Sequence, residues 1–143
     1  MGAVTHTAYG SLTTVLSTEL NSLANNANTA ASAAYDNSSN RDLFCDMELV
    51  VNTQGSARST GATVDVFMLA RADGANYPSL QESVAELVAS FPLDAATTSR
   101  RAVIRDIPLP PASVQFFARN RTGQALASSA NTVKIVPHSL TVA

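Results

Sequence analysis

Residues 43–52 read Leu-Phe-Cys-Asp-Met-Glu-Leu-Val-Val-Asn, and this stretch decides the fold class of the 143-residue chain. Large apolar side chains recur at every second position, which is the period of a β-strand that buries one face. The residues that share this face are Leu43, Cys45, Met47, Leu49 and Val51. We therefore predict a strand here, with this face in the core of the domain.

A second alternating stretch, 62–71, begins after a polar loop at 53–61 that contains two glycines. Because a loop with glycines joins them, we predict that the two stretches form an antiparallel pair. The apolar face of the second stretch, which we expect in the same core, comprises Val64, Val66 and Met68. Beyond it, Asp73 and Asn76 predict a tight turn rather than a calcium loop, which would need further oxygen ligands.

Further stretches have the length and composition of short strands. Alternation is evident at 100–107, and the prolines that follow end it, since proline cannot donate to a sheet ladder. Other candidates are 31–35, 113–121 and 131–137. The segment 79–91 suits a helix, but 84–91 within it also suits a strand. About seven or eight short strands at even spacing predict an all-β fold, an antiparallel β-sandwich or jelly roll with one or two short helices.

The start of the domain permits two interpretations. In residues 12–23, the leucines and a valine fall at the i, i+3, i+4 spacing of a helix. However, Thr13, Thr14, Val15 and Thr18 are β-branched and lower the helix propensity. Either the segment is helical, or a strand runs into Val15 and a short helical turn follows.

Residues 1–11 have no regular apolar periodicity and predict an N-terminal arm, whereas 12–143 predict a single β-sandwich domain. Gly10 offers a hinge between the two. Ordering the backbone costs roughly 1–2 kcal/mol per residue, so an ordered arm needs contacts with a neighbouring molecule. The candidates for this contact are Val4, His6 and Tyr9. Deleting residues 2–10 should then weaken attachment and leave the melting temperature of the free domain nearly unchanged.

Composition excludes several classes of protein. Hydrophobic residues make up 45% of the chain, too many for intrinsic disorder, and 9 basic residues against 11 acidic ones argue against a nucleic-acid partner. No apolar run is long enough to span a bilayer, and residues 1–10 lack the features of a secretory signal. We therefore expect synthesis in the cytoplasm and no membrane partner. A single cysteine leaves no internal disulfide.

Charged residues make up only 14% of the chain, below the usual ~25%. Small uncharged residues take their place, above all between residues 21 and 40, where Asp36 is the only charged residue. A low-charge surface is typical of a protein that packs against copies of itself or a partner, since interface cores are depleted in charge. The alternative is a soluble domain whose composition reflects its genome.

Residues that could carry out chemistry each have a simpler structural interpretation. His6 and His138 lie near opposite ends of the chain, so we predict surface histidines and no metal site. Cys45 shares the apolar face and predicts a buried thiol rather than a nucleophile. Asp46 and Glu48 share the opposite face, which we expect to be solvated or to attract arginine from a neighbouring chain. No catalytic or cofactor site is predicted, and we expect the protein not to be an enzyme.

Two N-glycosylation sequons begin at Asn37 and Asn120. Without a secretory signal, both are expected to be chance matches. Arg119 and Arg121, beside two phenylalanines, could bind single-stranded nucleic acid, but two arginines in an acidic chain make a poor case. We take them instead as further candidates for contact with a partner protein.

Strand order and turn chemistry over most of residues 12–137 give the chain a likeness to one group of proteins. The segments concerned are the strand at 43–52 together with 20–24 (LNSLA), 33–40 (AAYDNSSN), 64–69 (VDVFML), 73–77 (DGANY), 107–111 (IPLPP) and 131–135 (NTVKI). In these features the chain resembles small virion proteins of tailed bacteriophages. Such proteins are typically β-sandwiches or jelly rolls, and the resemblance implies no catalytic residues and no cofactor.

Some of these phage proteins are decoration or cement proteins on the head, and others lie in tails or necks. The resemblance implies that the chain binds the major capsid protein on the outer surface of the head, bridges neighbouring subunits and forms a homotrimer. The alternative is a tail, neck or head-fibre module that binds a host-surface glycan or another virion protein. Three tyrosines and no tryptophan offer few aromatic rings for binding a glycan.

Overall fold

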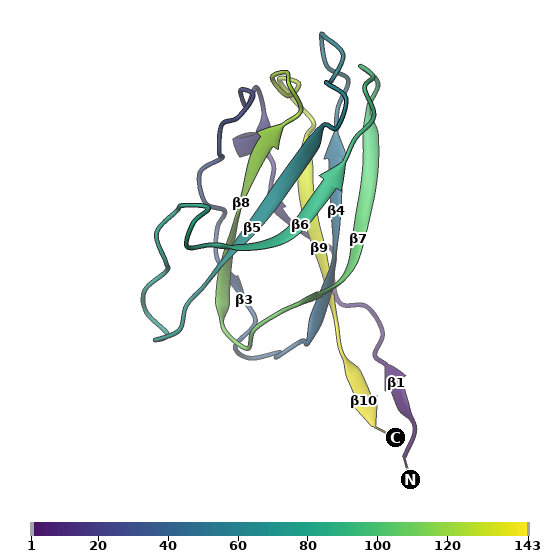
Figure 1. Cartoon of the computed structure of the whole chain (residues 1–143). Coiled ribbons are helices and arrows are strands. Elements are labelled where there is room, and N and C mark those ends of the chain that lie inside the picture. The colour runs from purple at the N-terminus through teal and green to yellow at the C-terminus, as the bar shows by residue number, and fades with distance from the viewer. Residues whose placement is uncertain (1, 143) are drawn as a thin grey trace.

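Two four-stranded antiparallel sheets face each other in the computed structural model, which describes residues 2–142 (Figure 1). The first sheet has the strand order β2 (Thr13–Leu16), β9 (Thr132–His138), β4 (Phe44–Val51) and β7 (Arg100–Pro108). The second has the order β3 (Tyr35–Asp36), β8 (Ser113–Arg121), β5 (Thr63–Ala70) and β6 (Glu86–Pro92). The predicted all-β, antiparallel sandwich is confirmed.

The path of the chain between the sheets is that of a jelly roll. When the strands from β2 to β9 are counted from one to eight, the two sheets have the orders 1-8-3-6 and 2-7-4-5. Every connection except that between β5 and β6 crosses from one sheet to the other, as in the double Greek key of jelly-roll domains. Among residues 2–142 there is one short 3-10 helix, η1 (Thr18–Leu20), and no helix that could cross a membrane.

The predicted antiparallel pair of 43–52 and 62–71 is wrong. Strand β4 is hydrogen-bonded to β7 and β9, whereas β5 is hydrogen-bonded to β6 and β8 in the other sheet. The loop at 53–61 is long enough to carry the chain across the distance of about 10 Å between packed sheets. A tight turn would have kept both strands in one sheet. The two apolar faces still meet, but across the core and not along a hydrogen-bonded ladder.

The predicted core faces are buried, with one exception. At most 3% of the residue is exposed at Cys45, Met47, Leu49, Val51, Val64, Val66 and Met68. Leu43, by contrast, is 48% exposed because β4 begins only at Phe44, so its placement in the core is wrong. The alternation therefore identifies the inward face of the strand but not the residue at which the strand begins.

Strand β5 is buried on both faces. On its outer face, Phe67 and Leu69 form a small separate cluster with Phe117 of β8, and the two phenylalanine rings stack with centroids 4.9 Å apart. Tyr77 and Ala85, from the long connection between β5 and β6, pack against this cluster. This explains why the apolar residues of β5 occupy both faces of the strand.

The ambiguous segments contain strands. In 12–23, β2 ends at Leu16 and η1 follows, which confirms the interpretation as a strand with a short helical turn after it. In 79–91, the strand interpretation is confirmed by β6, which ends at Pro92. The strand predicted at 31–35 is mostly irregular, since β3 begins only at Tyr35.

The segment 26–32 runs beside β8 without forming a regular strand. The amides of Thr29 and Ser32 donate to the carbonyls of Ala118 and Phe116 at 2.8 and 2.7 Å. In return, the amides of Ala118 and Phe116 donate to the hydroxyl oxygens of Thr29 and Ser32 at 3.0 and 2.9 Å. Side-chain hydroxyls thus replace backbone carbonyls beside β8. The small uncharged residues in this part of the chain therefore have a role inside the fold.

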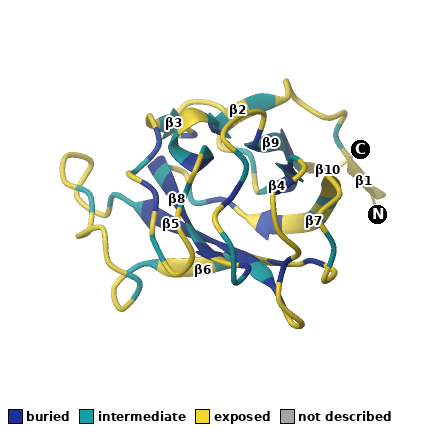
Figure 2. Cartoon of the chain, turned by 90° about the horizontal axis from the view of Figure 1, so that it is seen from above, coloured by how far each residue is buried: buried dark blue, intermediate teal, exposed yellow. Residues whose placement is uncertain are grey.

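Strands β1 (Val4–His6) and β10 (Leu140–Val142) form a two-stranded antiparallel ribbon that projects from the sandwich (Figure 1). All residues of this β1–β10 ribbon are exposed (Figure 2). The predicted arm therefore contains a strand paired with a distant segment of the chain. The last strand of the predicted 12–143 domain lies outside the sandwich.

Gly10 is not a free hinge. Its N–H donates to the carbonyl of Pro137 at 2.8 Å, and a Cβ at this position would lie 2.8 Å from Cγ of the same proline. Thr7 likewise donates through its N–H to the carbonyl of Ser139 at 2.8 Å. Residues 7–10 are thus held by hydrogen bonds at the base of the ribbon. A test of attachment by deletion should spare them and remove only residues 2–6.

Candidate functional site

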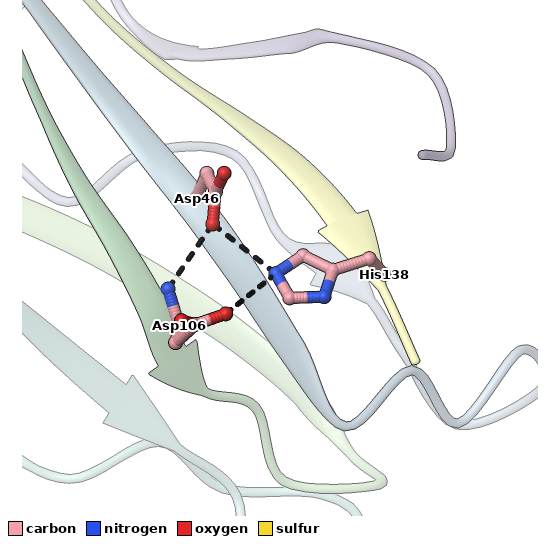
Figure 3. Close-up of side chains that lie close together, drawn as sticks. All are labelled: Asp46, Asp106 and His138. Atoms are coloured by element: carbon pink, nitrogen blue, oxygen red, sulfur yellow. Dashed lines mark hydrogen bonds and ion pairs between the residues drawn. The ribbon is translucent and has the colours of Figure 1, made fainter. Parts of the chain in front are cut away.

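Three titratable side chains meet at the base of the β1–β10 ribbon (Figure 3). Asp46 comes from β4, Asp106 from β7, and His138 from the end of β9. One ligand atom of each, a carboxylate oxygen or a ring nitrogen, lies within 4.8 Å of the other two. We call these three residues the ribbon-base cluster.

An irregular pairing of β4 with β7 positions one member of the cluster. The register shifts between Cys45 and Met47, so that Arg105 and Asp106 both stand opposite Asp46. Such a β-bulge redirects side chains out of the regular alternation. Asp106 has a φ of 57°, a left-handed conformation that aspartate tolerates better than most residues. The bulge brings both residues of β7 to the carboxylate of Asp46.

The Asp46 carboxylate is the centre of the hydrogen-bond network. Its Oδ1 accepts from the N–H of Asp106 at 3.1 Å, and its Oδ2 accepts from the Tyr9 hydroxyl and from Nη1 of Arg105, both at 2.9 Å. Burial raises the pKa of Asp46, but the hydrogen bonds from Asp106, Tyr9 and His138 outweigh it and bring the pKa below its ordinary value. The hydrogen bond to Asp46 in turn raises the pKa of Tyr9. At neutral pH, Asp46 is an anion and Tyr9 a donor.

The ring of His138 lies between the two carboxylates. Its Nε2 is 3.1 Å from Oδ1 of Asp46 and 3.3 Å from Oδ1 of Asp106. Phe44 stacks on the ring at a centroid distance of 5.7 Å, and Tyr9 meets it edge-on at 5.4 Å. These contacts leave the His138 side chain 4% exposed and fix the direction in which Nε2 points.

A cavity of about 260 Å³ opens beside the cluster. Its lining residues are His6, Thr7, Tyr9, Arg105, Asp106 and His138. Asp106 is 65% exposed, whereas the side chains of Asp46 and His138 are buried. Solvent and small ions therefore reach the buried pair from the side of Asp106.

Two predictions about these residues are wrong. His6 is exposed as predicted, but His138 is buried, and the two rings lie 6.1 Å apart because β1 pairs with β10. Asp46 is buried, not solvated, and the arginine that it attracts belongs to the same chain. Glu48 is half-buried and also binds an arginine of its own chain, Arg101, at 3.2 Å. Neither the bulge nor the pairing of distant strands has a signal in the sequence.

Three of the five candidate partner contacts lie on the ribbon or at its base. Val4 and His6 belong to β1, and Tyr9 follows it. Val4 is 63% exposed and Tyr9 is 57% exposed, although the Tyr9 hydroxyl is bound to Asp46. The structure thus brings the three N-terminal candidates together on one exposed feature.

The two arginine candidates lie elsewhere, on β8 of the other sheet. Arg119 forms an ion pair with Glu82, and Arg121 pairs with both Glu82 at 3.0 Å and Asp65 at 2.9 Å. The hydrogen bond from Arg119 outweighs desolvation and lowers the pKa of Glu82. The charges of both arginines are therefore balanced within the chain.

Other polar residues noted in the sequence have structural roles. Burial raises the pKa of the Cys45 thiol to about 12, which confirms the prediction of a buried thiol. Asn37 and Asn120 are 0% exposed, and their side-chain amides donate to backbone carbonyls, so these side chains are engaged inside the fold. The predicted tight turn is confirmed, since the carboxylate of Asp73 accepts from the N–H groups of Ala75 and Asn76.

Comparisons with known proteins assign no family to the chain. No protein-family model matches it, and no curated protein does either. The likeness to phage virion proteins therefore stays a prediction, and function has to be inferred from the fold and from the geometry of the site.

The ribbon-base cluster permits two kinds of chemistry. Within the described part of the chain, the groups paired with Nε2 of His138 are carboxylates, and no hydroxyl or thiol is hydrogen-bonded to it. This differs from catalytic sites in which histidine activates a serine or cysteine nucleophile. The cluster can fasten β4, β7 and β9 together at the base of the ribbon. It can also hold a cation between its two carboxylates and the imidazole.

Proposed function

We propose that this protein is a non-enzymatic structural protein of a bacteriophage particle, namely a decoration or cement protein. In this role it binds the major capsid protein on the outer surface of the head and bridges neighbouring subunits, which stabilises the shell. The observation that carries the proposal is the β1–β10 ribbon, which projects from the sandwich with every residue exposed.

The ribbon by itself has little to keep it ordered in water. It contains three residue pairs, and an isolated pair of strands is marginally stable at best. Val4 and Val142, which face each other in register, are 63% and 70% exposed. Exposed strand edges accept a further strand from another chain, as in many peptide complexes. A segment of the shell protein added to the ribbon buries these valines and pairs the free backbone groups.

The base of the ribbon gives it a defined direction. Hydrogen bonds join Thr7 to Ser139, Gly10 to Pro137, and Tyr9 to Asp46 of β4. A segment that is already oriented loses less conformational entropy on binding than a free arm does. These contacts support a role for the ribbon as an attachment device.

The rest of the molecule is compatible with the same role. Jelly rolls occur in viral capsid proteins as well as in lectins and cupins. The charged fraction of 14% is typical of a protein that packs against neighbours, including further copies of itself in a homotrimer. The likeness to tailed-phage virion proteins, seen in the sequence, points the same way. Synthesis in the bacterial cytoplasm precedes assembly on the virion.

Cryo-electron microscopy of particles of the phage that encodes the chain tests this proposal. We expect density for the sandwich on the outside of the head, with the β1–β10 ribbon against the major capsid protein. Density in the tail, the neck or a head fibre would contradict decoration. It would favour the alternative of a module that binds a host-surface glycan or another virion protein. Particles without the chain would contradict both.

A further inference from the structure

The ribbon-base cluster has the composition and spacing of a metal site. We propose that Asp46, Asp106 and His138 bind a divalent first-row transition-metal ion, with Zn²⁺ the best fit. This inference is independent of the role of the protein in a particle. It concerns a site that the fold builds from three strands and closes with the ribbon.

The distances agree with shared coordination. Nε2 of His138 lies 3.1 Å from Oδ1 of Asp46 and 3.3 Å from Oδ1 of Asp106. Ligand atoms that bind one zinc ion with bonds of about 2.0–2.2 Å lie roughly 3.0–3.5 Å apart. Figure 3 shows the three side chains converging from different strands, with these atoms directed toward one another. The carboxylate oxygens of Asp46 and Asp106 lie within 4.8 Å of each other, and an ion between the three atoms draws them to a common spacing.

One nitrogen of His138 faces two carboxylates at once. Nε2 of His138 carries one hydrogen at most, yet it faces an oxygen of each of two carboxylates. The side chains of His138 and Asp46 are only 4% and 6% exposed, whereas Asp106 is 65% exposed and faces the cavity. A divalent cation interacts with both carboxylates and with the nitrogen lone pair at once. Metal binding requires a neutral imidazole and ionised carboxylates.

Neighbouring residues support the ligands as outer-shell groups do in metal sites. Oδ2 of Asp46, which is not needed for the ion, accepts hydrogen bonds from Tyr9 and Arg105. Such bonds fix the orientation of a ligating carboxylate. His6, which lines the adjoining cavity, is a further nitrogen donor beside His138. Water or His6 completes the coordination of the ion from this open side.

The donor set selects the class of ion. One imidazole nitrogen with carboxylate oxygens suits zinc and related transition metals, whereas Ca²⁺ and Mg²⁺ prefer oxygen ligands alone. The thiol of Cys45 does not compete, because it is buried in the hydrophobic core. Binding joins β4, β7 and β9 where the ribbon begins, so the ion stabilises the folded state by an amount that grows with the logarithm of its free concentration above Kd.

The experiment uses the untagged full chain after treatment with a chelator. Titration with Zn²⁺ in a calorimeter, and with Co²⁺ followed by visible absorption, should show one saturable site per chain and a rise in melting temperature. Mg²⁺ and Ca²⁺ at the same concentrations should produce neither effect. The absence of a saturable site for Zn²⁺ and Co²⁺ would overturn the proposal.

Two variants locate the site. Asp106→Asn removes a ligand at a position that is 65% exposed and keeps a residue that tolerates the left-handed backbone, so the fold is preserved. We expect its affinity for Zn²⁺ to fall about tenfold or more, because loss of an outer-shell partner alone already costs about 10–100-fold. The control is Glu48→Gln, which neutralises a carboxylate on the same strand outside the cluster and should bind like the wild type. Equal affinities of the wild type and Asp106→Asn would contradict the assignment.

Discussion

At the scale of single residues, Arg58 shows how the fold accommodates a buried charge. Its side chain is 0% exposed, and its guanidinium donates to the carbonyls of Asp94 and Thr98 and to the side chains of Asp94 and Gln54. Arg58 lies in the connection between β4 and β5, and its partner Asp94 lies between β6 and β7. One side chain thus ties together two crossings of the sandwich.

Replacing this arginine tests that role. We expect Arg58→Met to lower the free energy of unfolding by about 2–4 kcal/mol, because buried carbonyl and amide oxygens lose their donor. The matched control is Arg100→Met, which removes an exposed arginine from the same aspartate and should change stability little. Denaturant unfolding of the three proteins measures the difference. An equal decrease in the free energy of unfolding in both variants would show that the burial of Arg58 adds nothing to its contribution to stability.

Asp73 predicts part of the dependence of stability on pH. Hydrogen bonds from the N–H and the side chain of Asn76 and from the N–H of Ala75 lower its pKa from 3.8 to about 2. The folded protein therefore takes up this proton at a lower pH than the unfolded chain does. The resulting stabilisation is complete above the unfolded pKa of 3.8 and is lost as the pH falls toward about 2.

The contribution of Asp73 can be checked by melting temperatures between pH 7 and pH 2. The proteins compared are the wild type and Asp73→Ala. The wild type should be the more stable at neutral pH, and the difference should shrink below a pH of about 4. A difference that stays constant over the whole range would contradict the assignment of the low pKa to Asp73.

At the scale of the elements, the inward face of β4 can be tested at Met47 and Leu43. Both belong to the apolar face predicted from the alternation at 43–52. Met47 is fully buried, whereas Leu43 precedes the strand and is 48% exposed. Met47→Asp should unfold or severely destabilise the protein, because it buries an unpaired charge. Leu43→Asp should remain folded. Thermal unfolding followed by circular dichroism distinguishes them, and near-native stability of Met47→Asp would mean that the inward face has been wrongly assigned.

Element types could be predicted from the sequence where their signals are local. The alternation at 100–107 and the prolines after it predict β7, and 113–121 coincides with β8. Strand partners could not be predicted in this way. The loop at 53–61 has glycines typical of a hairpin, but it connects β4 of one sheet to β5 of the other. Nothing within the loop distinguishes a hairpin from a connection between sheets. The irregular course of 26–32 depends on hydroxyl groups that bond to a strand far along the chain.

At the scale of the whole molecule, the candidate site depends on contacts that no local pattern encodes. Asp46 lies 60 residues from Asp106 and 92 from His138 along the chain. Each residue alone has an ordinary interpretation as a surface group. Only the strand order of the first sheet and the bulge in β7 bring them together. The overall sandwich was predictable from composition and alternation, whereas the site required the full topology.

The proposed homotrimer is also a property of the whole molecule. The shortage of charge favours self-association, and the resemblance to phage virion proteins implies a trimer. Sedimentation of the isolated protein should therefore give three times the mass of one chain. Some cement proteins assemble only on the shell, and a monomer in solution calls for the same measurement on decorated particles. A chain that is monomeric in both conditions would contradict self-association.

The central claim is that the β1–β10 ribbon attaches the sandwich to the shell, and binding to capsids that lack the protein tests it most directly. Val4→Asp places a charge on the ribbon, and Val103→Asp places one at an exposed position of β7. Because a charge in a dry interface is costly, we predict that Val4→Asp weakens binding about tenfold or more, with an unchanged melting temperature. Val103→Asp should bind like the wild type. Full affinity of Val4→Asp for the capsids would contradict the claim.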